Sequence, residues 1–448
     1  MSEIQKQIAL LHHTGGGNLG DEASLDAVIL NIRRRWPQTA ITIFSMNPED
    51  TAKKHGVPSY PIRRYSWGIG YQSNGKGTAP TVESSRGQRF PIFTSNRLVR
   101  ALRFFTREPA FLLASRRMLA SFDYLVVTGG GQFTERGGPW SLPYALWVWL
   151  LMAKSVHVKC ILLNVGAGPL NHSLSKTFAR RTLFAADYVS FRDLQSEALA
   201  RRLGYSGKSQ VFPDNVYNLD VSLPDASCEK RPVPVVGIAP MPYPFCDPRQ
   251  HPAGSLQSIY DDYLAKLAAS CSSLVQSSYA IEMFGSDVGV DAAAIEDLRT
   301  VLQDRYNIAT PPYRQVDSVR DILSRMSTMD YVVTCRFHGV VFAHLLNKPV
   351  LAISHHPKVA NLMHDLGLSQ YCVDIQTFNS NELTEKFQSL VRNTEEVKSS
   401  MAASLARYKS ELTVQFDQLF PVSPAPIHNS DSNQSECGEH IVETGTRV

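Results

Sequence analysis

Residues 330–354 read DYVVTCRFHGVVFAHLLNKPVLAIS, and this stretch decides the fold class. It opens with an apolar, strand-like run that ends at Thr334, and Arg-Phe-His-Gly follows at 336–339. A helix-like apolar segment at 340–346 and a second strand-like run at 350–353 complete the pattern. Runs of these lengths predict a strand, a helix and a second, parallel strand. The predicted fold class is therefore α/β.

Arg336 and His338 are expected where the first of these strands ends. Loops at the carboxyl ends of parallel strands line the ligand crevice of an open α/β sheet, and the N-terminus of the following helix attracts anions. An arginine there offers a planar fork to a carboxylate or a phosphate, and a histidine exchanges protons near neutral pH. The alternative interpretation is a buried arginine bonded to carbonyl oxygens and a structural histidine.

Four other predicted strand ends carry turns of a similar kind. Their sequences are GGGNLGD at 15–21, TGGGQ at 128–132, GAGP at 166–169 and Arg-Asp at 192–193. Glycines let backbone amides approach a ligand closely, so several such turns on one side of a sheet predict an anion site, although a tight turn explains each one alone. Gly15, Gly17 and Gly20 match a dinucleotide fingerprint in spacing. We reject that match because no acidic residue ends the second strand, at 40–44.

Together these motifs resemble the polysaccharide pyruvyl transferase family. They occur in the family's order over roughly residues 8–370, which is most of the chain. The landmarks are GGGNLGDE at 15–22, GGGQ at 129–132, GAGP at 166–169, SFRD at 190–193 with Ser196, Pro213-Asp214, RFHG at 336–339, and PKV at 357–359 ahead of Leu366-Gly367. The chain departs from the family at His355-His356, where many members have a Tyr-Asp or similar pair, and at 63–117, which looks like an insertion. Both departures bear on the acceptor rather than on the donor.

Length and composition fit an enzyme with two domains. The chain has 448 residues, too many for one ordinary domain, and 43% of them are hydrophobic, which is enough for full cores. No apolar run is long enough to cross a bilayer, and the N-terminus lacks the pattern of a secretion signal. The 7 cysteines are scattered without C-x-x-C spacing, which predicts a reducing compartment and no cysteine-based metal site. We therefore expect a cytoplasmic protein.

The order of the strand and helix patterns divides the chain in two. The first series runs through residues 1–222, a Pro-rich linker follows, and the second series occupies 235–420 and carries the Arg-Phe-His-Gly motif. We expect two doubly wound, Rossmann-like domains facing each other across a cleft. The resemblance implies the same, since the family is described as similar to the two-domain GT-B glycosyltransferase fold. One amphipathic helix is predicted at 380–420, and residues 421–448 are predicted to be disordered.

The net charge of +4 is unevenly spread along the chain. Residues 63–117 hold eleven Lys or Arg against two acids, and four arginines there fall on one side of a predicted helix: Arg97, Arg100, Arg103 and Arg107. Such a helix suits an anionic membrane, at its inner face, or a lipid-linked diphosphate saccharide. A solvated helix that packs its apolar side on the core is the alternative. Nucleic acid is not expected, because no known binding motif accompanies the charge.

The resemblance implies a donor, an acceptor and a reaction. Phosphoenolpyruvate gives its pyruvyl group to two hydroxyls of a polysaccharide or its lipid-linked precursor, forming a ketal and releasing phosphate; no other cofactor is implied. The donor carries a carboxylate and a phosphate, which suit Arg192 and Arg336 from opposite domains. His338 is assigned as the general acid, or as the acid that helps phosphate leave. Lys358 is expected to meet phosphate, with a solvated lysine as the equal alternative.

Two glycine-rich loops supply further candidates for backbone contacts to donor or acceptor. They are Gly17 and Asn18 in the first loop, and Gly130, Gly131 and Gln132 in the second. Asp21 is expected to cap the first helix rather than to act as a base. His355 is a further candidate site residue. The pairs 12–13 and 355–356 are not expected to bind metal, because neighbours in a strand point to opposite faces.

Two other functions stay open on the sequence. A nucleotide-sugar glycosyltransferase of the same architecture would bind a nucleoside diphosphate in the second domain, but the acidic residue expected at its ribose is not evident. A non-catalytic saccharide-binding protein would keep the fold alone, since fold does not fix function. The joint presence of Arg192, Arg336 and His338 argues against such a loss of activity.

Overall fold

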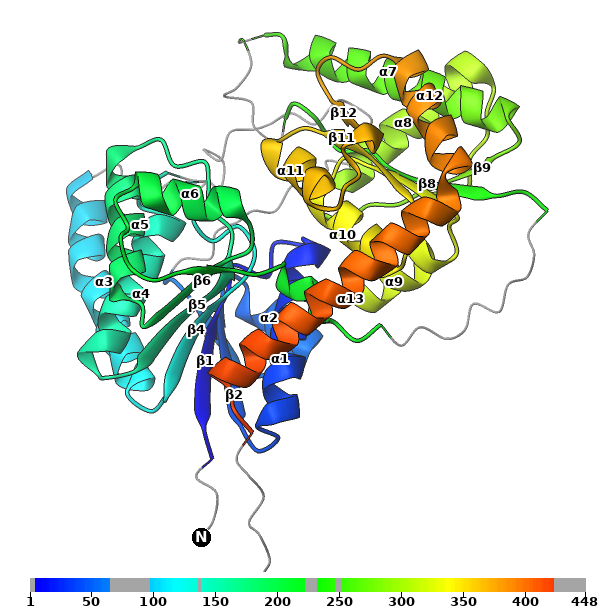
Figure 1. Ribbon diagram of the computed structural model, residues 1–448. Helices are drawn as coiled ribbons and strands as arrows, with labels where there is room; N and C mark the ends of the chain where they lie inside the picture. Colours follow the sequence, from blue (N-terminus) through cyan, green and yellow to red (C-terminus); the bar gives the residue numbers. More distant parts are fainter. Residues whose placement is uncertain are drawn as a thin grey trace, which may run out of the picture.

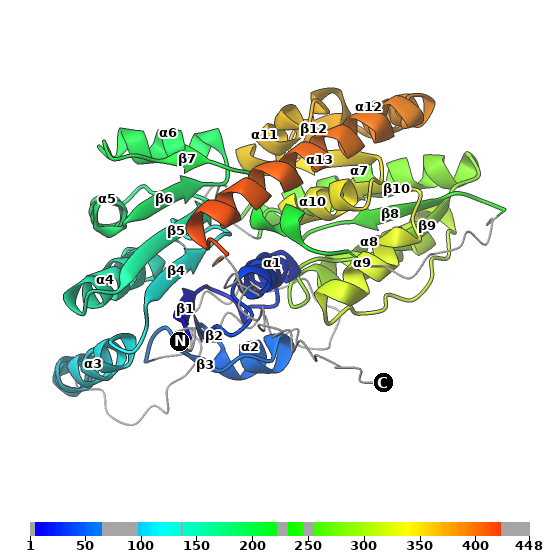
Figure 2. The ribbon, with the colours of Figure 1, turned by 60° about the horizontal axis from the view of Figure 1, so that its bottom comes forward.

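The computed structural model of the protein describes residues 5–64, 97–135, 138–221, 232–245, 252 and 254–422, with the backbone alone for 97–107. Most of the predicted linker and of the predicted disordered tail lie outside the described residues, as do the side chains of Arg97, Arg100, Arg103 and Arg107. Two α/β units lie side by side, and one long helix, α13 (Thr394–Leu419), runs across both (Figures 1 and 2).

The first unit is built on a sheet of seven parallel strands in the order β3-β2-β1-β4-β5-β6-β7. This is the Rossmann order, in which the chain reverses its winding direction between β1 and β4. The strands are β1 (Gln7–Leu11), β2 (Ala40–Ser45), β3 (Ser59–Pro61), β4 (Tyr124–Thr128), β5 (Lys159–Val165), β6 (Tyr188–Phe191) and β7 (Gln210–Val211).

Helices cover both faces of this sheet, so its central strands are apolar along their whole length. The helices are α1 (Leu19–Arg35), α2 (Pro48–His55), α3 (Arg97–Leu119), α4 (Leu142–Ser155), α5 (Ser173–Ala185) and α6 (Leu194–Arg202), with a short 3-10 turn, η1 (Asn215–Asn218). On one face Val127 packs with Trp149 of α4. On the other, Val126 packs with Val28 of α1 and with Phe416 of α13.

The second unit has five parallel strands in the order β12-β11-β10-β8-β9. Counted within the unit, that order is 2-1-3-4-5, the other common doubly wound arrangement, with its reversal between β8 and β10. The strands are β8 (Val235–Ala239), β9 (Ala280–Met283), β10 (Tyr331–Thr334), β11 (Val350–Ser354) and β12 (Cys372–Asp374). β10, α10 (Phe337–Leu345) and β11 confirm the strand-helix-strand prediction for residues 330–354.

The remaining helices flank the second sheet, but one prediction about them is wrong. They are α7 (Leu256–Gln276), α8 (Asp291–Tyr306), α9 (Val319–Ser327), α11 (Pro357–Asp365), the 3-10 turn η3 (Ser369–Tyr371) and α12 (Ser380–Arg392). The single helix predicted at 380–420 is two, α12 and α13, which break at Asn393. The Asn393 side-chain amide donates to the Tyr371 hydroxyl at 3.0 Å.

The C-terminal half of α13 returns to the first unit (Figure 1). Arg35 of α1 donates to Asp417 at 2.8 Å. The fully buried Gln415 amide exchanges hydrogen bonds with Asn164 at the end of β5, at 2.8 and 2.9 Å. Because a buried amide is costly to leave unpaired, this contact ties the end of the chain to the first sheet. Among the described helices, none is long and apolar enough to cross a membrane.

Candidate active site between the two domains

The candidate site lies where loops at the carboxyl ends of the two sheets meet. Loops after β1 and β4 in the first unit and after β10 in the second follow strands that flank a reversal, which is where doubly wound proteins bind ligands. Other residues of the site follow β6, β9 and β11. The first glycine-rich loop is bonded directly to the second unit: Leu19 N–H donates to Ser286 O at 2.9 Å, and Val288 N–H donates to Gly17 O at 2.9 Å. The Gly17 carbonyl is therefore used in domain docking.

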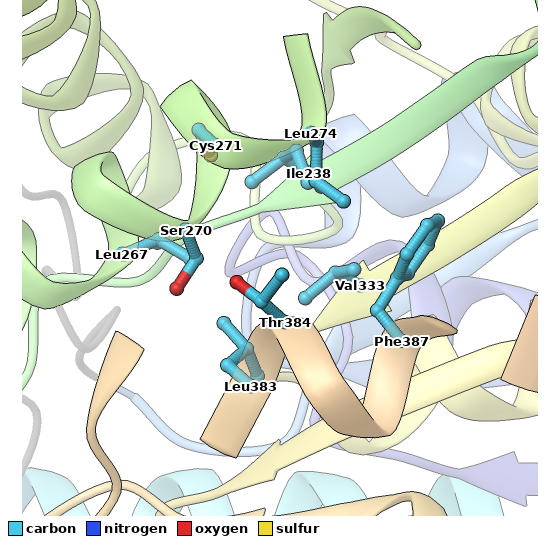
Figure 3. Close-up of a pocket in the computed structure, with 9 residues that line it drawn as sticks. All are labelled: Ile238, Leu267, Ser270, Cys271, Leu274, Val333, Leu383, Thr384 and Phe387. Carbon is cyan, nitrogen blue, oxygen red and sulfur yellow. The ribbon is translucent and has the colours of Figure 1, made fainter. Parts of the chain in front are cut away.

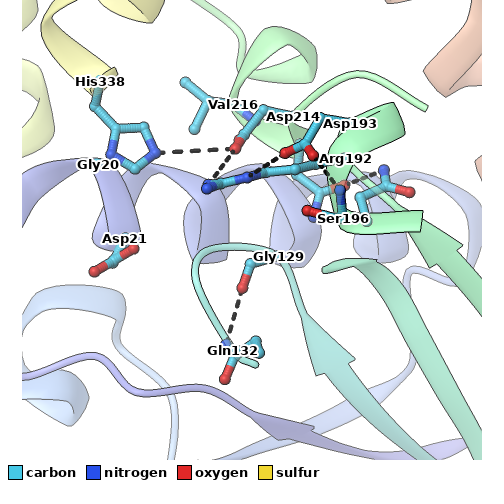
Figure 4. A network of polar contacts seen from close by, with 12 residues as sticks. Gly20, Asp21, Gly129, Gln132, Arg192, Asp193, Ser196, Asp214, Val216 and His338 are labelled. Carbon is cyan, nitrogen blue, oxygen red and sulfur yellow. Dashed lines mark hydrogen bonds and ion pairs between the residues drawn. The ribbon is translucent and has the colours of Figure 1, made fainter. Parts of the chain in front are cut away.

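Arg192 reaches from the first unit to the second (Figure 4). It follows β6, and its guanidinium lies within 3.4 Å of both Asp193 and Asp214. Its Cζ sits 4.5 Å from the ring centroid of Phe337, in the Arg-Phe-His-Gly motif. The guanidinium also lies flat against Gly166, where a Cβ would fall 2.6 Å from Nε. The GAGP turn therefore makes room for this arginine, which is 8% exposed.

His338 occupies the first turn of α10 and faces the N-terminus of α1 across the domain boundary. Its Nε2 is 3.9 Å from Asp214 Oδ2, too far for a hydrogen bond. Burial lowers the pKa of His338, and the positive charges of Arg192 and Lys358 add to that effect against the opposing carboxylates of Asp214 and Asp21. The imidazole is therefore neutral at neutral pH, and a bound anion would raise its pKa.

Arg336 is held by a carboxylate that the sequence did not indicate. Its Nε donates to Asp291 Oδ1 at 3.0 Å, its Nη2 contacts the same oxygen, and Asp287 lies 3.8 Å away. Asp291 is fully buried, and its second oxygen accepts the N–H groups of Ser286 and Asp287 at 3.1 and 3.0 Å. Arg336 thus fixes the 286–288 loop that meets Gly17 and Leu19. Any anion bound to Arg336 would share it with Asp291.

His355 and Lys358 follow the next strand, β11. His355 interacts electrostatically with Arg336, and Lys358 with His338. The His355 Nδ1 is 2.8 Å from the Cys335 carbonyl oxygen. Burial lowers the pKa of His355 well below its usual value, and Lys358 and Arg336 lower it further, so it is neutral. His356 caps α11 by accepting the Lys358 N–H at 3.2 Å. Lys358 therefore sits in the first turn of α11 and interacts electrostatically with His338.

Asn18, not Asp21, caps α1, so the capping role predicted for Asp21 is wrong. The Asn18 side chain accepts the N–H groups of Gly20 and Asp21 at 2.9 and 3.4 Å. Because the turn preceding α1 already satisfies those donors, the Asp21 carboxylate is left to pair with His13, with Nε2 and Oδ2 3.1 Å apart. Burial opposes ionisation of Asp21, but the charge and hydrogen bond of His13 outweigh it and lower its pKa.

His12 and His13 lie side by side, which corrects the expectation that they point to opposite faces. β1 ends at Leu11, so the alternation of a strand does not extend to them. Their rings stack 4.8 Å apart at 18°. Burial lowers the pKa of His12 to about 3, so it is neutral. In the part of the chain that the structure describes, no group of three or more His, Cys, Asp or Glu side chains is arranged to hold a metal ion.

The second glycine-rich loop packs against the pair of His13 and Asp21. Gly130 has φ +74°, and a Cβ there would fall 3.0 Å from Asp21 Oδ1 and 3.0 Å from His13 Cε1. Gly131, next to it, has no atom within 4 Å of its Cβ position. The fully buried Gln132 donates to Thr128 O and Gly129 O at 2.8 and 2.9 Å (Figure 4). Gln132 therefore closes the turn, and Gly131 is the open member of the loop.

Several residues at the site escaped the sequence reasoning. Asp214 was recognised as a landmark without a role, and His13 was weighed only as a metal ligand. Asp291 and His55 were not considered. His55 is held between Glu22 at 2.7 Å and Asp26 at 2.6 Å, and Glu22 also accepts the Gly15 N–H at 3.2 Å. Each of these contacts joins separate elements, so local sequence pattern did not indicate it. The one signal that the sequence offered was the acidic first turn of α1 and of α8.

A separate apolar pocket lies inside the second unit (Figure 3). It is bounded by β8, β10, α7 and α12, and its lining is Ile238, Leu267, Ser270, Cys271, Leu274, Val333, Leu383, Thr384 and Phe387. The Ser270 and Thr384 hydroxyls donate to the Ser380 carbonyl oxygen at 3.2 and 2.8 Å. The pocket thus presents hydrocarbon and is distinct from the charged site between the domains.

The fold and the site define a two-domain α/β enzyme of the GT-B type, with arginine, lysine and histidine side chains gathered between the domains. A family model described as polysaccharide pyruvyl transferase matches residues 18–357, and the chain belongs to that family. It is therefore a transferase. Of the residues described at the site, the match leaves out His12, His13, Gly15, Gly17 and Lys358.

Solved structures share the fold at low sequence identity. A protein described as a UDP-N-acetylglucosamine 2-epimerase from Listeria monocytogenes has a TM-score of 0.56 at 12% identity, covering 92% of this chain and 94% of its own. A glycosyltransferase from Rickettsia africae has a TM-score of 0.52 at 10% identity, covering 94% and 100%. S. aureus MnaA, in a structure with UDP, has a TM-score of 0.50 at 10% identity, covering 91% and 92%. No curated protein matches the chain.

Proposed function

We propose that the protein transfers the pyruvyl group of phosphoenolpyruvate to two hydroxyls of a saccharide, on a polysaccharide or its lipid-linked precursor, forming a pyruvate ketal. The observation that carries the proposal is the meeting of Arg192, from the first domain, with His338 and Lys358 from the second. A donor with two anionic groups needs cations on both sides, and its enol carbon needs a proton. These three side chains offer both.

The proposed reaction balances with these groups. C3 of the enol accepts a proton, the oxygen of one hydroxyl bonds to C2, and the C2–O bond to phosphate breaks. The second hydroxyl oxygen then bonds to C2 and completes the ketal. Of the two protons that the hydroxyls release, one replaces the proton given to C3 and the other accompanies phosphate.

His338 is the proposed proton donor to C3 or to the departing phosphate. Its imidazole is neutral in the free protein. The entry of a donor bearing a carboxylate and a phosphate raises its pKa, so donor binding favours the protonated imidazole that acts as the acid. The pair formed by His13 and Asp21 belongs to the first domain, and Asp21 interacts electrostatically with His338; this pair is the proposed acceptor of the hydroxyl protons. Arg192 and Lys358 hold the anionic groups, and Arg336 positions the loop between the domains.

A glycosyltransferase that uses a nucleotide sugar is the competing function on the same fold. The likeness to nucleotide-sugar enzymes rests on 10–12% identity and concerns the fold alone. The arginine and lysine that meet between the domains, with a histidine beside them, suit a donor whose anionic groups lie next to the reacting carbon.

The test is release of phosphate from phosphoenolpyruvate in the presence of a panel of lipid-linked saccharides, compared with release of nucleoside diphosphate from nucleotide sugars. His338→Ala and His338→Gln should lower kcat by about 10²–10⁴ and change donor affinity far less. His364→Gln, on an imidazole whose side chain is 81% exposed, is the matched control. Consumption of nucleotide sugars alone, or His338 variants within a few-fold of the parent, would overturn the proposal.

A further inference from the structure

The helices on the two faces of the first sheet differ sharply in charge. α3, α4 and α5 cover one face and share one apolar core (Figures 1 and 2). Outside 97–107, whose side chains the structure does not describe, these helices hold six Lys or Arg and a single acid, Glu108. α1 and α2, on the other face, hold five Lys or Arg and five Asp or Glu. The fold therefore concentrates positive charge on one outer layer of the protein.

The same layer exposes large apolar side chains. Trp140, just before α4, is 58% exposed, Leu151 of α4 is 52% exposed, and Leu113 of α3 is 47% exposed. Exposed apolar residues are ordinary when scattered, but contiguous ones indicate an interaction surface. Trp140, Leu151 and Leu113 form an interaction surface only if they adjoin one another.

Hydrogen bonds between α3 and α4 place two of them together. Arg116 of α3 donates to the Ser155 hydroxyl and carbonyl oxygen at 2.8 and 3.2 Å. α3 and α4 run parallel, because each leads back across the sheet to the next parallel strand. Leu113 precedes Arg116 by one helical turn, and Leu151 precedes Ser155 by one turn. Leu113 and Leu151 are therefore neighbours on the outer surface.

Arginines lie over the aromatic rings at the other end of the layer. Arg181 of α5 lies 5.2 Å from the ring centroid of Trp147, and Arg63 lies 5.7 Å from that of Tyr144. The Trp140 ring packs against Tyr144 at 5.4 Å. Trp140, Tyr144, Trp147 and Leu151 recur at helical spacing, so aromatic and aliphatic groups form a stripe along α4 that cations border.

We propose that this layer of α3, α4 and α5 is a docking surface for an anionic phospholipid membrane. Cations above a bilayer gain from its negative surface potential, and tryptophan and leucine insert at the level of the headgroups. Three helices that carry one acid among them and project apolar groups offer both contributions at once. The inference stands on the first domain's outer surface and does not depend on the proposed reaction.

The experiment is co-sedimentation of the full chain with vesicles of phosphatidylcholine, with and without phosphatidylglycerol. The parent should bind the anionic vesicles, bind the neutral ones far less, and lose binding as salt rises. Each cation near such a surface strengthens binding about five-fold, so Arg117→Gln with Lys176→Gln should weaken it about 25-fold. Arg305→Gln with Arg320→Gln removes the same charge from exposed positions on α8 and α9 and should leave binding unchanged.

The apolar contribution has its own variant. Trp140→Ser should weaken vesicle binding several-fold at constant charge, and membrane-bound parent should show a blue shift of tryptophan emission that this variant reduces. Circular dichroism checks that the variant is folded. Equal binding of the parent to neutral and anionic vesicles, equal binding by the two charge variants, or binding to a soluble polyanion such as dextran sulfate with none to vesicles would each overturn the proposal.

Discussion

Replacing Gly20 by alanine tests the contact that joins the two halves of the candidate site. A Cβ at this position would lie 1.8 Å from His338 Nδ1 and 1.9 Å from Cγ. Carbon atoms in contact sit about 3.5–4.0 Å apart, so the imidazole would have to retreat by about 2 Å. Gly20 is the second residue of α1, and alanine is a better helix former than glycine, so a loss of activity would not come from a weakened helix.

The expected effect on turnover is large. A displacement of about 1 Å at a reacting group can cost a factor of about 10², and the loss of a positioned acid costs about 10²–10⁴. Gly20→Ala should therefore lower kcat by about 10²–10⁴, or about 3–5 kcal/mol of transition-state stabilisation. Phosphate release measures turnover, and thermal unfolding with and without phosphoenolpyruvate measures fold and donor binding.

Gly16→Ala is the matched control in the same loop. A Cβ there would have no atom within 4 Å, so the substitution adds the same group without a collision. Its turnover should stay within a few-fold of the parent. The reasoning fails if Gly20→Ala also keeps near-parental kcat, or if both variants lose activity equally, because the close approach of Gly20 to His338 would then not govern the chemistry.

Three further predictions follow from charged contacts. Arg336→Lys should weaken phosphoenolpyruvate binding at least about ten-fold and lower the free energy of unfolding by about 1–3 kcal/mol, since a lysine cannot reproduce the two contacts of the guanidinium with buried Asp291. Calorimetric titration measures the binding and urea unfolding the stability. Arg325→Lys, at the pair with Glu282 away from the site, is the control. Because donor binding raises the lowered pKa of His338, affinity for phosphoenolpyruvate should increase as the pH falls below 7. His338→Gln should flatten that pH dependence, and equal slopes of affinity against pH in the parent and the variant would contradict the prediction. Burial opposes the charge of His55, but its carboxylate partners raise its pKa to about 9 from 6.5, so about 3 kcal/mol of stability is present below pH 6.5 and lost as the pH rises through about 9; urea unfolding of His55→Gln should lack this loss.

The sequence by itself determined the secondary structure around the site and the side of each sheet on which the site lies. The apolar runs before Thr128 and Thr334 are strands because both of their faces are covered by helices. Glycines and charged residues that follow such runs stand at the carboxyl ends of strands in any doubly wound fold. The positions of Arg192, Arg336 and His338 could therefore be predicted from local pattern alone.

The partners of these side chains were decided by the tertiary structure. Arg336 and Asp291 are 45 residues apart in sequence, and Gly20 meets His338 only because the two domains dock. Local pattern does not specify which loops of different sheets come within 4 Å, since that depends on the packing of whole domains. The charge of the outer layer has the same origin: α3, α4 and α5 are separate in the chain, and the sheet beneath them makes one basic face of three short segments.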